Sequence, residues 1–287
     1  MATLTDQLRS LAADKRIDLL GMAPIDRFAG IDARHHPASI FPEARTVLAI
    51  GKRIPRGALR GREEGTQMDL YEMYGRNWLV DRVLALATIT VAAFLEEQGW
   101  EAVALQDLPP EAPPTGVAVR DGLPPPNVIV DVRDAAVRAG LGEIGYCDEL
   151  LTPEFGPRQR LQLILTDAEL DPSPLCATAV CDHCGQCAAR CPLQAMSTAG
   201  DRQVEIGGRQ MTVAAIDYAI CRRCRNGAGP NNHHPAGRPD RLAALCVRTC
   251  VDHLERGDRI SNRFATTFRQ RPAWQVDAGG NASLQAE

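Results

Sequence analysis

The sequence is poor in lysine and aromatic residues and has no long apolar run. Lys15 and Lys52 are the two lysines among 32 basic residues, and the net charge of −4 provides no general attraction to nucleic acid. The most apolar stretch, 83–95, has 13 residues, which is too short to cross a bilayer. The first 16 residues hold no apolar segment of signal-peptide length and no twin arginine. We therefore expect a cytoplasmic protein with neither a membrane nor a nucleic-acid partner.

Cysteine, by contrast, is abundant and crowded. Eight of the ten cysteines fall between Cys181 and Cys250. A chain of 287 residues buries about 75% of its unfolded surface and needs no disulfides to be stable. A disulfide framework would also be spread more widely along the chain. The crowding therefore indicates metal binding.

The hydrophobic patterns predict a mixed domain, α/β or α+β, over residues 1–172. Helices are predicted at 4–18, 79–98 and 132–145, and strands at 17–25, 45–55, 99–105, 127–132 and 161–167. A second module of turns and short helices is predicted at 173–257. The tail, 258–287, is expected to pack back on the core through Phe264, Phe268 and Trp274 and to end disordered.

Four of the cysteines form one compact motif. Cys181, Cys184, Cys187 and Cys191, with Pro192 behind them, match the ferredoxin pattern C-x2-C-x2-C-x3-C-P. In this pattern three thiolates hold one 4Fe-4S cluster and the fourth reaches a second cluster. Zinc is the competing metal, because paired C-x2-C motifs also bind Zn²⁺. Zinc explains four cysteines but not the complete spacing with its proline, so the motif predicts iron-sulfur clusters.

A second set of cysteines completes the eight thiolates that two 4Fe-4S clusters need. It consists of Cys221, Cys224, Cys246 and Cys250. By the exchange of the fourth ligand, we assign one cluster to Cys181, Cys184, Cys187 and Cys250, and the other to Cys221, Cys224, Cys246 and Cys191. Cys147 and Cys176 are left over. Buried free cysteines commonly pack in cores, but Cys147 lies beside a glycine turn, so a ligand role stays open for it.

The segment AGLGEIGYCDELLTPEFGPRQRLQLILTDAEL, 139–170, resembles the corrinoid-binding core of reductive dehalogenases and epoxyqueuosine reductases. In that family a two-cluster ferredoxin module follows the core, as the cysteine motif does here. The match includes three glycines, the block TPEFGPR at 152–158, and a Thr-Asp pair at 166–167. The segments IGKRIP upstream and FRQRPAW downstream extend the resemblance over most of the chain. The block TPEFGPR is more similar to the dehalogenases than to the epoxyqueuosine reductases.

The resemblance implies a nitroreductase-like α/β fold that holds cobalamin near one cluster. The cofactor contacts that it implies are Gly140, Gly142, Gly145, Thr152, Gly156, Thr166 and Asp167. Glycines would let the backbone approach a flat macrocycle, because they lack Cβ. The same glycines also suit a helix C-cap and a turn with no ligand.

The sequence departs from both branches of the family. The great length of respiratory dehalogenases and the C-terminal helical repeats of epoxyqueuosine reductases are both missing from it. Asn77 and Trp78 replace the acid and the tyrosine of the reductases' GRDYH segment, and Asp131 and Asp134 lie out of register with the expected acidic proton donor. Epoxyqueuosine in tRNA is therefore a weak substrate candidate.

The resemblance predicts an oxidoreductase that reduces a small organic molecule with electrons from an external ferredoxin or flavodoxin. Such a reaction needs single electrons and a proton donor. We expect proton donors among Tyr71, Tyr74 and Tyr146, each of which would also suit ordinary packing, and anion contacts at Arg76 and Arg158.

Two loops are expected to carry specificity, because loops on a rigid frame commonly do so. They are the proline-rich stretch 108–126 and the insert 225–245 between Cys224 and Cys246. The alternative function is a cobalamin-free, two-cluster electron-transfer or reactivating protein.

Overall fold

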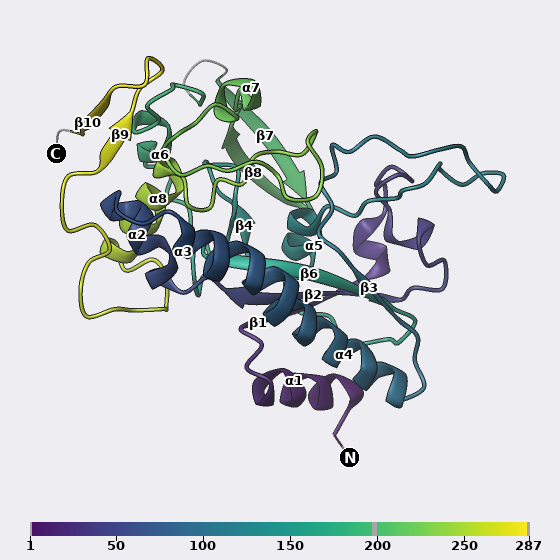
Figure 1. Cartoon of the computed structure of the whole chain (residues 1–287). Helices are drawn as coiled ribbons and strands as arrows, with labels where there is room; N and C mark the ends of the chain where they lie inside the picture. The colour runs from purple at the N-terminus through teal and green to yellow at the C-terminus, as the bar shows by residue number, and fades with distance from the viewer. Residues whose placement is uncertain (1, 197–199, 286–287) are drawn as a thin grey trace.

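The structure is a computed structural model that describes residues 2–196 and 200–285. Its centre is a four-stranded antiparallel sheet in the order β1-β2-β6-β3 (Figure 1). The strands are β1 (Leu19–Pro24), β2 (Thr46–Arg53), β6 (Gln159–Thr166) and β3 (Ala102–Leu105). The predicted mixture of strands and helices is confirmed, and four of the five predicted strands form this sheet. Because every pair is antiparallel, the sheet contains no parallel βαβ units.

Helices cover both faces of the sheet. They are α1 (Leu4–Asp14), α4 (Ala85–Glu97) and α5 (Val132–Arg138). Leu48 and Ile50 of β2 pack with α1 and α4, whereas Val47 and Ala49 pack with α5. Successive residues of a strand point to opposite faces, so a strand buried on both sides needs the unbroken apolar run that this sequence has.

α4 is the last part of a continuous helix, Asp69–Glu97, which lies across the sheet in Figure 1. The sequence predicted only its second half, because Gly75 and the polar residues after it interrupt the apolar pattern. The first half contains wide π-type turns at Glu72–Asn77 and Leu79–Leu84. By length and composition alone this helix could cross a membrane, but the core helices of soluble proteins pass the same test. The absence of a membrane partner therefore stays a prediction.

α5 begins directly after Asp131, whose carboxylate accepts hydrogen bonds from the amides of Arg133 and Asp134. Because this N-cap starts a helix, the strand predicted at 127–132 is wrong. Ile129 is buried as a strand residue would be, but its amide donates to Arg34 O in a loop. The helix is also shorter than predicted, since it ends at Arg138 before a glycine with φ of +79°.

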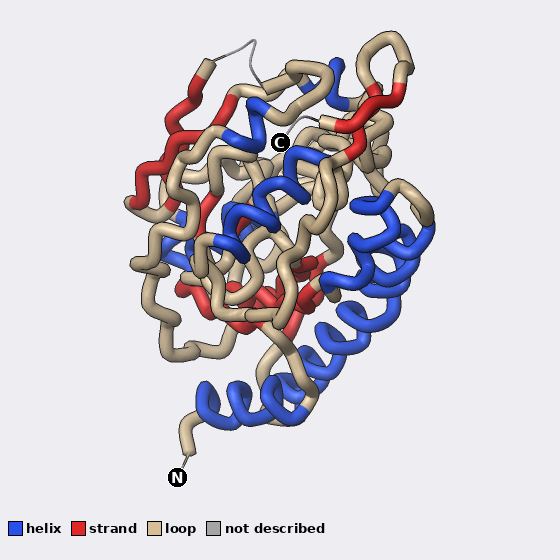
Figure 2. The backbone as a smooth tube through the Cα atoms, turned by 90° about the vertical axis from the view of Figure 1, so that its left-hand side faces the viewer, coloured by secondary structure: helices blue, strands red, loops and turns tan. Residues whose placement is uncertain are grey.

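The cysteine-bearing half of the molecule is mostly loop (Figure 2). It contains α6 (Gln186–Ala189), α7 (Tyr218–Cys221), α8 (Leu245–Arg256), β7 (Asp201–Ile206) and β8 (Arg209–Ala214). The short helices were predicted, whereas the β7–β8 hairpin was missed. Its signal was the pair Gly207-Gly208, which suits a two-residue hairpin turn and has positive φ at both residues.

Buried ion pairs connect the core, the cysteine-bearing half and the tail. Glu63, in α2 (Arg60–Glu64), lies 2.8 Å from Arg248 of α8 and 2.6 Å from Arg269 of the tail. Of the three tail residues predicted to pack on the core, Phe268 is fully buried and Trp274 is half-buried, whereas Phe264 is 42% exposed. The division of the chain near residues 172 and 257 stays a prediction.

The end of the tail was expected to be disordered, and this is wrong for the residues that the structure describes. They form a hairpin of β9 (Trp274–Val276) and β10 (Ala282–Leu284). Residues 286 and 287 lie outside the described range.

The substitution Gly142→Ala tests the tight approach of β4 (Glu143–Ile144) to β5 (Leu150–Leu151). An alanine Cβ there would lie 2.0 Å from Leu151 O. We expect the free energy of unfolding, measured in urea, to fall by about 1–3 kcal/mol, the usual cost of overpacking. Gly57→Ala is the control, because nothing lies within 4 Å of its Cβ position. Equal losses in the two variants would contradict the prediction.

Candidate functional site

The eight cysteines of the two sets lie around two small cavities. The first cavity is lined by Cys181, Cys184, Cys187 and Cys250, together with Cys147. The second is lined by Cys191, Cys221, Cys224 and Cys246. The two are similar in size, about 340 and about 370 Å³. The structure thus groups the sulfurs in the same two sets that the spacing predicted.

Helix α8 contributes a cysteine to each cavity. Cys246 faces the second cavity and Cys250, about one turn later, faces the first. Cys187 comes from α6, which packs against α8. The helix therefore lies between the two sets of sulfurs, and its position decides whether either set is complete.

Backbone amides point at two of these sulfurs. Tyr146 N donates to Cys181 Sγ at 3.4 Å, and Asn226 N donates to Cys224 Sγ at 3.3 Å. Hydrogen bonds of this kind stabilise negative charge on sulfur and influence the reduction potential of a bound cluster. The chain therefore offers support to a charged sulfur at each cavity.

Burial keeps the thiols themselves neutral. It raises the pKa of Cys221 to about 11 and that of Cys246 further, although the charge of Arg241 opposes both shifts. Burial also raises the pKa of Cys187. Such thiols lose their protons at neutral pH only to a metal. The donor set therefore fits a thiolate-bound metal or cluster and not a free cysteine nucleophile.

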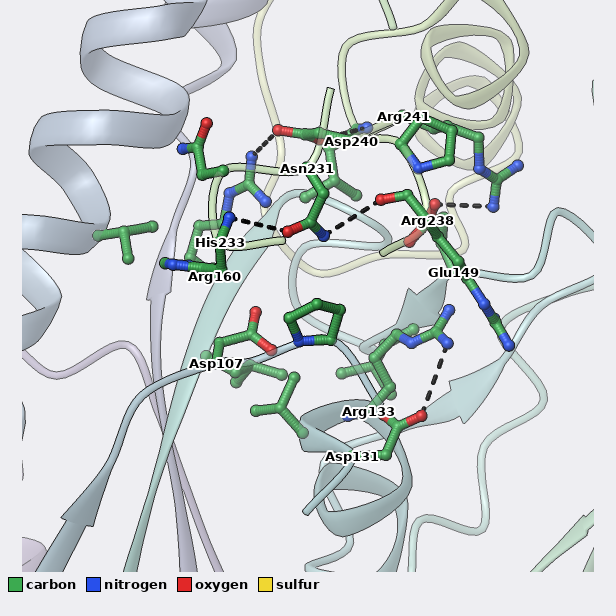
Figure 3. A pocket seen from close by; sticks show the side chains of 18 of the residues that line it. Asp107, Asp131, Arg133, Glu149, Arg160, Asn231, His233, Arg238, Asp240 and Arg241 are labelled. Atoms are coloured by element: carbon green, nitrogen blue, oxygen red, sulfur yellow. Dashed lines mark hydrogen bonds and ion pairs between the residues drawn. The ribbon is translucent and has the colours of Figure 1, made fainter. Parts of the chain in front are cut away.

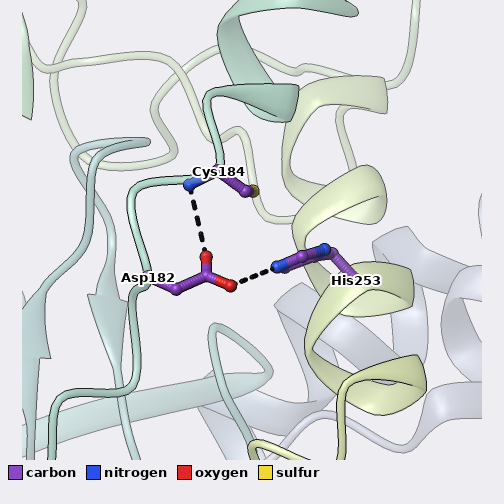
Figure 4. A group of neighbouring side chains, drawn as sticks. All are labelled: Asp182, Cys184 and His253. Carbon is purple, nitrogen blue, oxygen red and sulfur yellow. Dashed lines mark hydrogen bonds and ion pairs between the residues drawn. The ribbon is translucent and has the colours of Figure 1, made fainter.

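Asp182 and His253 flank Cys184 on the exposed side of the first cavity (Figure 4). Asp182 accepts a hydrogen bond from Cys184 N at 3.2 Å and lies 2.8 Å from His253 Nε2. Burial raises the pKa of Asp182, but its contacts with His253 outweigh this and hold it below the usual value. The three side chains could hold a metal ion by their spacing. Because Cys184 also lines the first sulfur cavity, we assign the Asp182 carboxylate and the His253 imidazole to that same site, as groups that lie around its cysteines.

A larger pocket of about 1090 Å³, a volume that includes space open to solvent, is shown in Figure 3. It is lined by Arg241, whose charge acts on Cys221 and Cys246 of the second cavity. Its walls come from β6, from the start of α5, from residues 109–111 and from residues 231–242. Both loops that the sequence suggested for specificity therefore line this pocket.

The pocket holds five arginines and five acids, and four of the acids are paired. The pairs are Arg160–Asp240 at 2.5 Å, Arg238–Glu111 at 2.6 Å, Arg241–Glu149 at 2.8 Å and Arg133–Asp131 at 3.7 Å. Asp107 is the fifth acid and makes no hydrogen bond or ion pair with any described residue. Its carboxylate points into the pocket in Figure 3. Burial and the negative charge of Asp131 raise the pKa of Asp107 to about 7.

Asp240 organises one wall of the pocket. It accepts hydrogen bonds from Tyr71 Oη at 2.8 Å and from Arg160 Nη2 at 2.5 Å, and its carboxylate lies 3.3 Å from Arg76 Nε. Burial raises the pKa of Asp240, but the charges of Arg160 and Arg76 outweigh burial and lower it overall. The aspartate therefore stays ionised and holds two arginines in place.

Arg241 connects the pocket to the second sulfur cavity. It is 1% exposed and donates from Nη2 to Cys147 O at 2.8 Å, while its charge acts on Cys221 and Cys246. Its buried Nη1 has no hydrogen-bond partner in the described residues. A negatively charged cluster in the second cavity would provide a counter-charge for this guanidinium.

The structure brings only part of the predicted catalytic set to the pocket. Arg76 lines it, and Tyr71 lies behind Asp240. The other three lie elsewhere. Tyr74 is half exposed beside Trp78, Tyr146 donates to Asp201 at 2.7 Å, and Arg158 is buried with Asn262 and Glu255.

The predicted cofactor contacts make contacts within the chain and do not line the pocket. An added Cβ at Gly140 would meet Pro174 O at 2.1 Å, and one at Gly145 would meet Leu151 Cδ1 at 2.4 Å. The other four predicted cofactor contacts form hydrogen bonds within the chain. Thr152 and Gly156 exchange backbone hydrogen bonds with each other. Thr166 Oγ1 accepts one from Ala168 N, and Asp167 accepts one from Glu101 N. Gly140, Gly142 and Gly145 are glycines because this chain packs tightly against them.

Sequence reasoning missed Asp107, Arg160, Asp240 and Arg241. Nothing in their local spacing marks them, since they come from a loop, a strand and the insert. Only their convergence on one pocket identifies them.

The chain has relatives of known activity. It is 44% identical over 72 residues to a tetrachloroethene reductive dehalogenase of Desulfitobacterium hafniense, a match that covers 24% of this chain and 13% of that protein. No known family profile matches the chain.

Solved structures share its fold. An epoxyqueuosine reductase from Streptococcus thermophilus has a TM-score of 0.50 and 17% identity, covering 78% of this chain and 57% of that one. A reductive dehalogenase solved in relation to B12-dependent dehalogenation has a TM-score of 0.48 and 15% identity, covering 97% of this chain and 40% of that one. The likeness to the epoxyqueuosine reductase shows a fold of mixed α/β architecture. The resemblance to reductive dehalogenases and epoxyqueuosine reductases is confirmed.

An epoxyqueuosine reductase among the similar structures was solved with a tRNA stem loop. The absence of a nucleic-acid partner for this chain stays a prediction.

The substitution Asp240→Asn tests the buried charge network. It removes the partner of two buried arginines, so we expect a loss of about 3–5 kcal/mol in unfolding free energy at pH 7. Because the folded pKa of Asp240 is lowered, its contribution is complete above its unfolded pKa of about 3.9 and disappears as the pH falls through the folded value. The difference in stability between the two proteins should therefore begin to shrink near pH 4 and disappear only below the lowered folded pKa of Asp240. Asp258→Asn, at an exposed carboxylate, is the control, and a similar loss there would contradict the prediction.

Proposed function

We propose that the protein is an iron-sulfur and cobalamin-dependent reductase of a small organic molecule, with its active site in the charged pocket. The observation that carries this proposal is the grouping of eight cysteines, four and four, around two cavities, together with Arg241, which lines the pocket while its charge acts on two sulfurs of the second cavity. The relatives cover only a small part of this chain, and the chain spans 13% of the dehalogenase's length. Activity, substrate and partners therefore all belong to the proposal.

The first set, Cys181, Cys184, Cys187 and Cys250, would hold one 4Fe-4S cluster, and Cys191, Cys221, Cys224 and Cys246 would hold the other. Cys184 is exposed, which suits electron entry from a ferredoxin or flavodoxin. The second set lies beside Arg241 at the pocket. The two sites are thus ordered from the surface to the active site.

A corrinoid in the pocket would supply a redox-active cobalt. The pocket is open to solvent, so a large cofactor would be only partly enclosed by it. Paired arginines along its walls can bind the polar substituents of a large cofactor or an anionic substrate. The glycines, threonines and aspartate that were predicted as cofactor contacts do not line this pocket. They could therefore contact a cofactor only through a part of it that lies outside the pocket.

Asp107 is the proton donor in this proposal, in place of the tyrosines. Two electrons and one proton replace a leaving group by hydrogen, and the leaving group departs as an anion. Burial and the negative charge of Asp131 outweigh the charges of Arg160 and Arg133, which favour the ionised form of Asp107, and the resulting pKa of about 7 leaves a large protonated fraction at neutral pH. The donated proton is recovered from solvent, to which the pocket is open.

A cytoplasmic location is also part of the proposal, because glutathione keeps cysteines reduced there, and all ten cysteines are free in the structure.

A second candidate is a cobalamin-free electron-transfer protein with the same two clusters. It is favoured by one observation, the packing of Gly140 and Gly142 against the chain's own carbonyls. Cobalt content separates the two functions.

Anaerobic purification should yield about eight irons and one cobalt per chain. The variants Cys181→Ala and Cys221→Ala should each lose about four irons, because each removes a ligand from a different cluster. Cys176→Ala, outside both cavities, is the control and should keep all of them. Eight irons without cobalt, in a protein that takes up no cobalamin, would favour the carrier. Zinc in place of iron would overturn both functions.

In the reductase, Asp107→Asn should lower the turnover rate about 10²–10⁴-fold, the usual contribution of a general acid. The wild-type rate should fall above about pH 7, where Asp107 loses its proton, and the variant should lack this dependence. Asp121→Asn, in the same proline-rich loop but exposed, is the matched control. An unchanged pH profile in the Asp107 variant would remove Asp107 from the mechanism.

A further inference from the structure

The long helix Asp69–Glu97 has an outer face that is apolar and open to solvent. Figures 1 and 2 show this helix at the outside of the molecule, with no other described element over its outer face. Only 39% of its most apolar window is buried, and Leu86 is 69% exposed. The helix carries six of the fourteen large apolar side chains that are exposed in the described residues: Met73, Tyr74, Trp78, Val83, Leu86 and Ile89. Clusters of this kind commonly mark interaction sites.

Spacing along the helix brings these side chains together. Trp78, Arg82 and Leu86 follow one another at intervals of four residues, about one helical turn. The opposite side of the helix packs on the sheet, where Val91 and Leu95 are fully buried. Because a helix that is apolar on both sides is normally buried on both, the outer face requires a partner.

Two opposite charges lie near the middle of this face. Asp81 and Arg82 are both exposed, and neither forms an ion pair with any residue that the structure describes. Neighbouring positions on a helix do not face each other, so the two charges cannot satisfy each other well. Arg82 instead lies over the ring of Trp78, with its guanidinium carbon 5.7 Å from the ring centre. The face therefore offers one acid and one base to a partner that carries the same two charges in the reverse order.

We propose that the partner is a second copy of this chain, whose own helix packs antiparallel against this face about a twofold axis between Asp81 and Arg82. A twofold axis pairs each position with the one that lies equally far on its other side. Tyr74 then lies opposite Ile89 of the partner subunit, and Trp78 lies beside Leu86 of the partner subunit. At the centre, each Arg82 lies beside Asp81 of the partner subunit. One arrangement thus covers the apolar side chains and pairs both charges.

The charges of the helix argue against a membrane surface as the partner. Helices that lie in a membrane interface are rich in Lys and Arg on their polar face, because these residues attract anionic lipid headgroups. This helix has five acids and only two basic residues: Asp69, Glu72, Asp81, Glu96 and Glu97, against Arg76 and Arg82. Anionic lipid would be repelled, whereas a second copy brings matching charges.

The first experiment measures the mass of the full-length protein by sedimentation equilibrium in anaerobic, reducing buffer, which prevents disulfides between copies. The wild type should be a dimer of the 31.1 kDa chain at micromolar concentrations. Leu86→Glu should raise the dissociation constant at least about tenfold, because it places a charge in an apolar contact. Val119→Glu is the matched control, since Val119 is 80% exposed in the proline-rich loop, and it should leave the constant unchanged. Circular dichroism checks that each variant is folded.

Reversal of the two central charges tests the antiparallel arrangement. Asp81→Arg alone would bring arginines together at the centre of the dimer, and Arg82→Asp alone would bring acids together. Each single variant should therefore dissociate more readily than the wild type. The double variant carries both charges in exchanged positions, so it should dimerise nearly as well as the wild type.

Several results would overturn the inference. A wild type that stays monomeric at micromolar concentrations would do so, and so would a dimer that Leu86→Glu leaves intact. A double variant as weak as the single variants would contradict the antiparallel pairing. A monomer that binds vesicles of phosphatidylglycerol would assign the face to a membrane instead. None of these results depends on iron or cobalt content, so the inference is tested separately from the proposed function.

Discussion

The buried contact between Arg248 and Glu63 determines where helix α8 lies, and both sulfur cavities depend on that helix. The two side chains are 0% and 4% exposed and 2.8 Å apart. Replacing a buried ion pair with well-packed apolar residues often leaves the stability unchanged, so the pair itself adds little net stability. Removing only one partner is strongly destabilising, because the other charge stays buried without a counter-charge. The effect of the pair is therefore positional: moving α8 away would leave the buried Arg248 without its carboxylate, although Glu63 would still pair with Arg269. With α8 held in this way, Cys246 and Cys250 face separate cavities.

Charge is organised differently in the neighbouring pocket. Paired arginines and acids keep the pocket polar without a large net charge, and Asp107 alone among its acids makes no ion pair within residues 2–196 and 200–285. An unpaired acid in a partly buried site keeps its proton to a higher pH, which makes it the natural group for proton transfer. Arg241 belongs to both regions, so a change of charge at the sulfurs acts directly on the wall of the pocket.

Several features could be predicted because they depend on local spacing. The strand at 45–55 and the helix at 4–18 follow from periodic apolar residues, and the two groups of four cysteines follow from the ferredoxin pattern. The predictions failed where tertiary contacts overruled a local pattern. Residues 127–132 are apolar enough for a strand, but the cap at Asp131 starts a helix there. Gly140 and Gly142 match a cofactor-binding pattern, yet their missing Cβ atoms make room for the chain's own backbone.

By itself, the sequence determined the grouping of the eight cysteines into two sets of four, because that grouping follows from their spacing along the chain. It also determined the mixed fold class, because the spacing at which apolar residues recur along the sequence differs between helices and strands. Only the tertiary structure decided which acid of the pocket makes no ion pair with a described residue, which arginine lines the pocket while its charge acts on the sulfurs, and that a fifth cysteine joins the first cavity. These properties depend on distances between residues far apart in the chain, and no local pattern encodes such distances.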